Sequence, residues 1–306
     1  MTHTHLQSTH TYLQLQGLWL PLITPFANGR LDETSLRRLV KHYLTQPVDG
    51  FIMAATTGEG LTLDERETEK LVRITADEVA QSGQAIPVYL GVSGSYTDRV
   101  VRYIKNTTYW PIDGYLISCP YYTKPSQTGL VQHFTALAAS TNRPIVIYNI
   151  PYRTGVNLAN EAMLQLAELQ NIIGVKDCCA IPEQSFELMQ NKPVGFQVMT
   201  GEDAFLYRAL TNGADGGILA SAHILTGTIA NIRNKLAAGD LVGAKADWAA
   251  LEHLPELLFA EPSPSPIKHW LWRAGLIESP EVRLPMVPVS ADLAKCIDEE
   301  MKRHST

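Results

Sequence analysis

The chain has 306 residues, of which 45% are hydrophobic and 18% are charged, so it can bury a large core and is not intrinsically disordered. Lysine and arginine number 25 against 31 aspartates and glutamates, and no basic block is present, so nucleic-acid binding is not expected. No apolar run reaches the roughly 18 residues of a membrane helix, and no secretion signal opens the chain, so neither a membrane partner nor export is expected. The four cysteines form no CxxC pair, which is typical of a cytoplasmic protein.

Eight short runs of apolar and β-branched residues recur along the chain and are predicted to be strands. They cover residues 18–23, 50–54, 87–91, 114–118, 144–148, 172–176, 196–199 and 217–220. Most intervals have the spacing of an amphipathic helix, as in Leu36, Leu39, Val40 and Tyr43, where Asp32 is the expected helix cap. Apolar strands that alternate with helices indicate a parallel sheet covered on its outer face, and eight such units close a barrel.

We therefore predict an α/β fold, a TIM (β/α)8 barrel over residues 17–225, preceded by a flexible N-terminal extension over residues 1–16. Residues 226–306 are predicted to form a C-terminal helical extension of about three helices around the segment EPSPSP at 261–266. The alternative is an open doubly wound sheet. It is disfavoured because no GxGxxG motif follows the first predicted strand.

The most informative residue is Lys176, at the end of the sixth predicted strand. Functional residues of such a barrel gather at the C-terminal ends of its strands. Burial at the barrel mouth disfavours the ammonium form and lowers the pKa of an amine, which is how a lysine becomes a Schiff-base nucleophile toward a carbonyl group. The alternative is a lysine that reaches the surface and pairs with Asp177.

Other strand ends carry polar residues that fit this chemistry. Tyr148 lies one strand–helix unit before the lysine and could move protons at an imine, or simply pack at the rim. Thr56 and Thr57, followed by Gly58, offer hydroxyl and backbone N–H groups that could cradle a carboxylate, although Thr-Thr-Gly is as often a simple turn. Arg153 could clamp a second carboxylate or pair with a nearby acid.

Five motifs, in this order and spacing, resemble the dihydrodipicolinate synthase and N-acetylneuraminate lyase superfamily. They are ATTGE at 55–59, PYYTKPSQTGL at 120–130, YNIPYRTG at 148–155, GVKD at 174–177 and EPSPSPIK at 261–268. The resemblance covers nearly the whole chain from residue 17. It implies a class I pyruvate aldolase on a TIM barrel with a C-terminal helical extension, usually a homotetramer built as a dimer of dimers. It also implies that no cofactor or metal is needed, because the lysine forms a covalent imine with pyruvate.

The resemblance also implies catalytic roles for individual residues. Lys176 is similar to the lysine that forms the imine, and Tyr148 to the tyrosine that moves protons around it. Thr56, Tyr148 and Tyr122 resemble the proton relay of the synthase branch, in which the second tyrosine of PYY is inserted from a neighbouring subunit. If Tyr122 is shared across the tight dimer in this way, oligomerisation is part of the active site.

Substrate-binding positions follow from the same resemblance. Thr57 and Gly58, with the local backbone, resemble the pyruvate carboxylate site. Gly201 and Ile218 match positions whose backbone lines the pocket. The expected partners are small molecules, pyruvate and an aldehyde.

Arg153 favours the synthase branch, in which an arginine at this position binds the carboxylate of aspartate semialdehyde. Sialic acid lyases usually carry a smaller or apolar residue there and a second acid at the position of Ala204. The resemblance thus implies condensation of pyruvate with L-aspartate 4-semialdehyde to 4-hydroxy-tetrahydrodipicolinate. Two alternatives stay open. One is an aldolase or dehydratase of another 2-keto acid, of the 2-keto-3-deoxy sugar acid or N-acetylneuraminate type, through the same imine, and the other is a catalytically silent barrel with a binding or regulatory role.

Two other classes of barrel enzyme are not expected. A metal-dependent hydrolase is disfavoured because no HExxH motif is present and five histidines are scattered along the chain, at His42, His133, His223, His253 and His269. A phosphate-binding barrel is disfavoured because Gly216 and Gly217 precede the eighth predicted strand, whereas a phosphate cradle would follow it.

Overall fold

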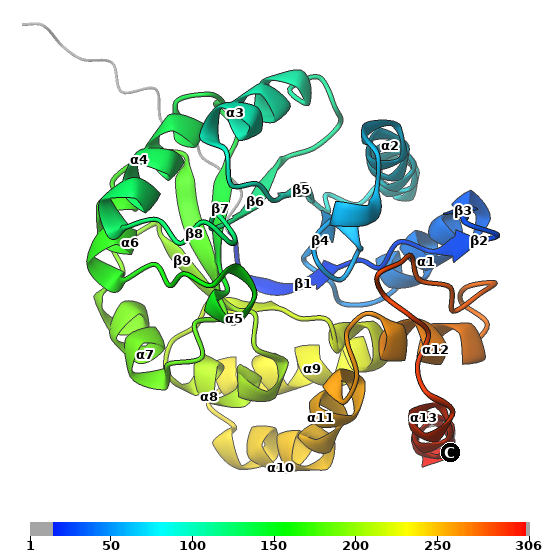
Figure 1. Ribbon diagram of the computed structural model, residues 1–306. Helices are drawn as coiled ribbons and strands as arrows, with labels where there is room; N and C mark the ends of the chain where they lie inside the picture. Colours follow the sequence, from blue (N-terminus) through cyan, green and yellow to red (C-terminus); the bar gives the residue numbers. More distant parts are fainter. Residues whose placement is uncertain (1–14, 304–306) are drawn as a thin grey trace, which may run out of the picture.

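Eight parallel strands close into a barrel in the computed structural model, which describes residues 15–303 (Figure 1). Around the barrel the strands follow the order β1-β10-β9-β8-β7-β6-β5-β4. Their bounds are β1 (Gly17–Pro21), β4 (Gly50–Met53), β5 (Val88–Val92), β6 (Gly114–Ser118), β7 (Ile145–Asn149), β8 (Ile172–Asp177), β9 (Gln197–Thr200) and β10 (Gly216–Ile218). Each overlaps one of the eight predicted runs, and the predicted TIM barrel is confirmed.

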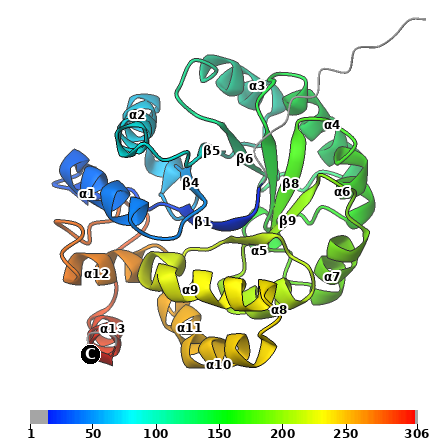
Figure 2. The ribbon, with the colours of Figure 1, turned by 180° about the vertical axis from the view of Figure 1, so that it is seen from behind.

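A ring of helices covers the outside of the barrel. It consists of α1 (Glu33–Leu44), α2 (Glu65–Ser82), α3 (Thr97–Asn106), α4 (Gln127–Ala138), α6 (Asn160–Leu166), α7 (Pro182–Asn191), α8 (Leu206–Thr211) and α9 (Ala222–Ala237). Asp32 caps α1 as expected, because its side chain accepts a hydrogen bond of 3.0 Å from the N–H of Ser35. Figure 2 shows α9 beside α8 and against β1, where it completes the ring.

Several short elements have no counterpart among the predicted ones. Strands β2 (Phe26–Ala27) and β3 (Arg30–Leu31) form an antiparallel pair outside the barrel. The single-turn helix α5 (Pro151–Thr154) follows β7 and lies over the centre of the barrel in Figure 1. The short helices η1 (Gly60–Thr62) and η2 (Asp203–Phe205) follow the turns after β4 and β9.

Aromatic rings fill the interior of the barrel. Trp19 and Tyr89 are both 1% exposed and pack edge to face, with their ring centroids 4.9 Å apart. Glycines face these rings on neighbouring strands, since a Cβ at Gly50 would lie 2.4 Å from the Trp19 ring. Leu15 is fully buried and belongs to the same interior cluster. The end of the predicted flexible extension is therefore part of the core, and residues 1–14 lie outside the described residues.

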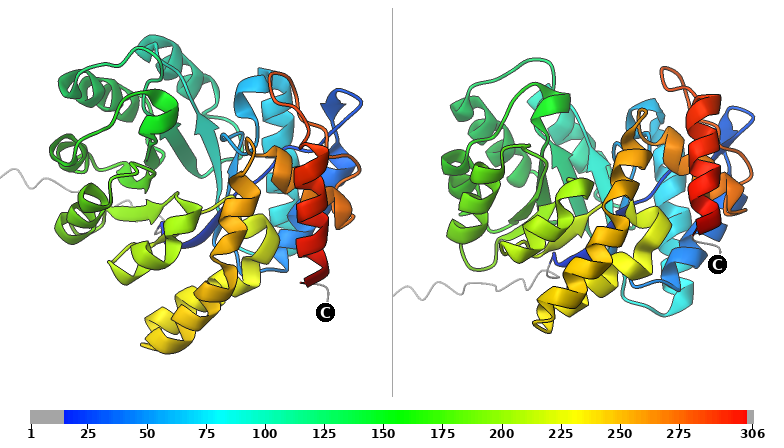
Figure 3. Two further views of the ribbon diagram at one scale, coloured as in Figure 1. Left: turned by 60° about the horizontal axis from the view of Figure 1, so that its bottom comes forward. Right: turned by 90° about the horizontal axis from the view of Figure 1, so that it is seen from below.

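The C-terminal helices lie together on one side of the barrel, as the yellow, orange and red ribbons of Figure 3 show. They are α10 (Leu241–Leu251), α11 (His253–Phe259), α12 (Ser265–Arg273) and α13 (Ala291–Arg303), so four helices follow α9 where the sequence predicts about three. The boundary predicted at residue 225 falls inside α9, at a kink where Leu225 leaves the helical region. Within residues 15–303 no helix combines the length and the apolar character that crossing a membrane requires.

A buried charge network joins this C-terminal region to the turn after β4. Lys268 on α12 is fully buried, and its Nζ lies 2.5 Å from Oε1 of Glu59. The same Nζ donates to the carbonyl of Glu281 at 2.7 Å, and Oε2 of Glu59 accepts from the N–H of Arg283 at 2.9 Å. Burial lowers the pKa of Lys268 to about 8, although Glu59 opposes that shift. The C-terminal region therefore holds the turn that carries the ATTGE motif.

Candidate active site

Lys176 and Tyr148 are direct neighbours across the β7–β8 ladder, at the C-terminal ends of both strands. The Nζ of Lys176 lies 4.5 Å from the centroid of the Tyr148 ring. Lys176 is 5% exposed, and burial lowers the pKa of its amine, so the neutral, nucleophilic form is favoured. Burial raises the pKa of the Tyr148 phenol well above its usual value, so the phenol keeps its proton.

The structure contradicts the alternative in which Lys176 reaches the surface to pair with Asp177. The Asp177 carboxylate is held elsewhere, since it accepts a hydrogen bond of 2.5 Å from the hydroxyl of Ser185 and one of 3.1 Å from the N–H of Cys179. Consecutive side chains of a strand point to opposite faces, which separates Asp177 from Lys176. The lysine is thus left inside the barrel mouth.

The turn after β4 places the two threonines beside Tyr148. Thr56 is exposed at the mouth and lies close enough to Tyr148 to lower the pKa of its phenol, against the larger effect of burial, whereas Thr57 is 7% exposed. A Cβ at Gly58 would lie 2.8 Å from the carbonyl oxygen of Leu22, so only glycine fits this close approach. The turn therefore brings a hydroxyl close to the phenol.

Two further positions close the pocket around the amine. Gly201 follows β9, and a Cβ there would lie 2.4 Å from Cε of Lys176 and 2.4 Å from Sγ of Cys178. The glycine is required for the lysine to occupy this place. Ile218 ends β10, is fully buried, and belongs to the interior cluster that includes Tyr148.

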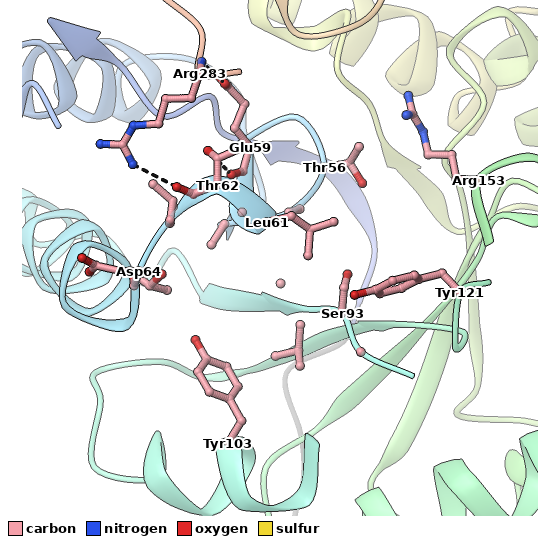
Figure 4. Close-up of a pocket in the computed structure, with 18 of the residues that line it drawn as sticks. Thr56, Glu59, Leu61, Thr62, Asp64, Ser93, Tyr103, Tyr121, Arg153 and Arg283 are labelled. Atoms are coloured by element: carbon pink, nitrogen blue, oxygen red, sulfur yellow. Dashed lines mark hydrogen bonds between the residues drawn. The ribbon is translucent and has the colours of Figure 1, made fainter. Parts of the chain in front are cut away.

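Arg153 stands at the edge of a cleft of about 870 Å³ that opens beside the barrel mouth (Figure 4). The cleft is also lined by Thr56 and Tyr121, and Figure 4 shows Arg153 and Thr56 at the same end of it. Arg153 is exposed and makes no ion pair with any residue between 15 and 303. The expected alternative, a pairing with a nearby acid, is therefore not seen, and the guanidinium is available to a ligand.

Tyr122 is the one predicted residue that a single chain does not bring to the site. Its side chain is 89% exposed, and its backbone has a positive φ of 70°, which is strained for a tyrosine. The N–H of Tyr122 donates to the carbonyl of Thr154 at 3.0 Å, which anchors the strained residue.

The structure adds a polar cluster that sequence reasoning did not identify as functional. The hydroxyl of Tyr152 donates to Oε1 of Glu202 at 3.0 Å, across the mouth from α5 to the turn after β9. Burial raises the pKa of the Cys178 thiol, two residues after the lysine, well above its usual value, and the nearby Glu202 carboxylate acts in the same direction. In the sequence, the only signal is that these residues directly follow predicted strands.

The residues that the structure describes include no group of three or more histidine, cysteine, aspartate or glutamate side chains arranged to hold a metal ion.

Fold and site together define a TIM-barrel enzyme with a buried lysine beside a tyrosine at the C-terminal mouth. The chain belongs to the dihydrodipicolinate synthetase family, whose model matches residues 14–304. It is 41% identical over 287 residues to 4-hydroxy-tetrahydrodipicolinate synthase 2 of Clostridium acetobutylicum, an alignment that covers 94% of this chain and 99% of the relative. It is 35% identical to 4-hydroxy-tetrahydrodipicolinate synthase of Syntrophus aciditrophicus, with 89% of this chain and 92% of the relative covered.

Solved structures agree with this assignment. Dihydrodipicolinate synthase of Thermotoga maritima superposes with a TM-score of 0.91 at 32% identity, over 95% of this chain and 98% of that chain. A structure described as the first monomeric dihydrodipicolinate synthase variant superposes with a TM-score of 0.90 at 33% identity, over 95% of this chain and 97% of that one.

Proposed function

We propose that the chain is a Schiff-base lyase that condenses pyruvate with L-aspartate 4-semialdehyde to 4-hydroxy-tetrahydrodipicolinate. The observation that carries the proposal is the buried amine of Lys176 in register with the phenol of Tyr148. The free guanidinium of Arg153 at the same mouth supports a carboxylate-bearing aldehyde as the second substrate. The names of the relatives support the same reaction.

The first half of the reaction is imine formation. The neutral amine of Lys176 adds to the keto carbon of pyruvate, and the carbinolamine loses water to give the protonated imine. Thr57 and the tight turn at Gly58 hold the pyruvate carboxylate. Tyr148 donates the proton that leaves with water and is reprotonated through the neighbouring hydroxyl of Thr56.

The second half forms the carbon–carbon bond. The imine nitrogen takes up the electron pair released when the pyruvate methyl group loses a proton, which gives an enamine. The enamine carbon attacks the aldehyde carbon of aspartate semialdehyde, whose carboxylate is held by Arg153, and the new alkoxide takes a proton. The substrate amine then displaces Lys176 from the imine carbon, which closes the ring and frees the lysine.

We infer that the working enzyme is an oligomer, a homotetramer built as a dimer of dimers, in which Tyr122 of one copy completes the site of another. Two features support this arrangement: the side chain of Tyr122 is 89% exposed, and its positive φ is a strain that proteins tolerate mainly at functional positions. In the second copy the phenol would extend the proton path from Tyr148 through Thr56 toward solvent.

Intact-mass measurement after borohydride reduction tests the proposal. Protein given pyruvate and sodium borohydride should gain one reduced pyruvyl group, and Lys176→Ala should gain none. Lys105→Ala, which removes an exposed lysine of α3, is the matched control and should label like the wild type. The same protein given pyruvate and aspartate semialdehyde should release the cyclised product.

The two other outcomes of this experiment would each assign a different activity to the chain. A pyruvate adduct without condensation would reject the proposed acceptor, and a panel of sugar-acid aldehydes would then be assayed through the same imine. Absence of any adduct in correctly folded protein would reject the Schiff-base chemistry and leave a barrel with a binding or regulatory role.

A further inference from the structure

The turn after β4, which carries Thr56, Thr57 and Gly58, lies between two residues in an unfavourable backbone conformation. Ala54 has a φ of 54° and Glu59 a φ of 52°, values that are uncommon for residues with a side chain. Such residues persist where the surrounding structure enforces them, and they gather at functional sites. The positions of the two threonines therefore depend on the contacts that hold the flanking residues in place.

The turn is closely packed against itself and against the chain after β1. The N–H of Glu59 donates to the carbonyl of Thr56 at 3.0 Å, and the hydroxyl of Thr24 donates to the carbonyl of Gly58 at 2.6 Å. A Cβ at Gly60 would lie 1.8 Å from the carbonyl oxygen of Ala54, so the two ends of the turn are in direct contact. Closely packed groups transmit displacements, and a movement of Glu59 would therefore be passed on to the threonines.

The side chain of Glu59 is held from outside the barrel by the C-terminal region. Its Oε1 lies 2.5 Å from Nζ of Lys268, and its Oε2 accepts from the N–H of Arg283 at 2.9 Å. Figure 4 shows Arg283 beside Glu59 and Thr62, and its guanidinium donates to the carbonyl of Thr62 at 3.0 Å. Helix α12 and the segment that follows it thus hold the turn at Glu59 and again just after it.

Lys268 is itself fixed in place. Its side chain is fully buried, its Nζ donates to the carbonyl of Glu281 at 2.7 Å, and the same atom lies 4.3 Å from the centroid of the Phe26 ring. Desolvation offsets much of the attraction between two buried charges, so a gain in stability does not by itself account for the pair of Glu59 and Lys268. A fixed cation beside a strained residue is suited to setting a position.

We propose that the Glu59–Lys268 pair positions the turn at Thr57 and Gly58 for the carboxylate of pyruvate, so that the C-terminal region sets the affinity of the enzyme for 2-keto acids. Glu59 and Lys268 act through the turn and are positioning residues. Loss of the pair lets Glu59 leave its strained conformation, which moves the hydroxyl and N–H groups of the turn away from the carboxylate. This inference rests on the proposed function, in which pyruvate forms an imine with Lys176.

Pyruvate and pyruvamide, in which a neutral amide replaces the carboxylate, separate this role from a general loss of structure. For each ligand, the half-saturating concentration of imine formation is measured from the mass adduct trapped by borohydride. In Lys268→Met, and in Glu59→Gln, which keeps an acceptor for the N–H of Arg283, we expect the value for pyruvate to rise about tenfold or more. The value for pyruvamide should change less than about twofold, and saturating pyruvate should still label both variants.

Two further variants serve as controls. Leu166→Ala removes a fully buried side chain of α6, which lies across the barrel from α12 in Figure 1. It should lower stability and keep the wild-type half-saturating concentrations. The double variant Glu59→Gln/Lys268→Met should raise the value for pyruvate no further than the larger single change, because both substitutions break the same contact. If Lys268→Met does not fold at the assay temperature, Glu59→Gln and the double variant still test the inference.

Several outcomes would contradict the proposed positioning role. An unchanged half-saturating concentration of pyruvate in the folded variants would overturn it. An equal loss for pyruvate and pyruvamide, or single effects that multiply in the double variant, would overturn it as well. Wild-type protein that forms no pyruvate adduct would instead refute the proposed function.

Discussion

The carboxylate of Glu59 and the ammonium of Lys268 form an ion pair that is closed to solvent on both sides, with side-chain exposures of 2% and 0%. The pair joins the turn that carries the threonines to helix α12, although the two residues come from opposite ends of the chain. Taking two charges out of water is costly, so the geometry of their partners decides whether the pair stabilises the fold.

Removal of one partner of this pair should be strongly destabilising. We expect Lys268→Met to lower the free energy of unfolding by about 3–5 kcal/mol, because the Glu59 carboxylate stays buried without a counter-charge. Urea denaturation measures the change. Lys70→Met is the matched control, since Lys70 pairs with Glu33 at the solvent-exposed surface and its replacement should leave the free energy of unfolding nearly unchanged. The double variant Glu59→Gln/Lys268→Met should recover part of the loss, and a single variant as stable as the wild type would contradict the prediction.

Imine formation should depend on pH through Lys176. The ammonium form has no lone pair, so the rate of pyruvate imine formation falls as pH falls below the pKa of this lysine. Burial lowers that pKa from 10.5. The rate should therefore reach its plateau at a pH lower than the pH at which exposed lysines lose their proton. Rapid borohydride trapping across a pH series gives the midpoint. A midpoint at or above 10.5 would show that the amine is not desolvated.

The proposed sharing of Tyr122 can be tested by mixing two inactive variants. Lys176→Ala lacks the amine, and Tyr122→Phe lacks the phenol offered to the other copy. After the subunits are exchanged, a mixed dimer has one complete site, so equal mixtures should recover about a quarter of wild-type activity. If both residues act within one chain, mixing should recover nothing. Gel filtration of each variant checks that the assembly is intact.

Acid should destabilise the protein through His223, which is fully buried behind the barrel mouth. Its Nε2 accepts from the N–H of Ile23 at 3.2 Å, and burial lowers its pKa to about 4 from 6.5. The unfolded chain therefore binds the proton first as pH falls, and the stability is lost between about pH 6.5 and pH 4. Urea midpoints at pH 7 and pH 5 measure this loss. His223→Asn, although less stable at pH 7, should have a flatter pH dependence over this interval, and an unchanged slope would exclude His223 as the cause.

The barrel could be predicted because each strand is a buried, near-continuous apolar run, and period and spacing are local properties of the sequence. The two-residue strands β2 and β3 and the single turn of α5 are too short to show any period. The pairing of Lys176 with Tyr148 followed from the spacing of consecutive strand–helix units, which fixes neighbours around a parallel barrel.

Contacts between distant segments could not be predicted in this way. A lysine such as Lys268 is usually exposed, and only the folded chain shows that Glu59 lies beside it. The same holds for Tyr152 and Glu202, which come from different loops at the barrel mouth. For Tyr122 even the folded single chain is not sufficient, because the Lys176 and Tyr148 that it is proposed to serve would belong to another copy of the chain.

The packed interior of the barrel has a kinetic consequence. Leu15, Trp19 and Tyr89 belong to the interior cluster that also contains Tyr148, so among residues 15–303 side chains fill the barrel below the catalytic tyrosine. We therefore expect both reactants to approach Lys176 from the end of the barrel that carries Arg153. The proposed imine must form before the aldehyde can react, so pyruvate should bind first, and a high concentration of aldehyde should slow turnover by occupying the approach to the unloaded enzyme.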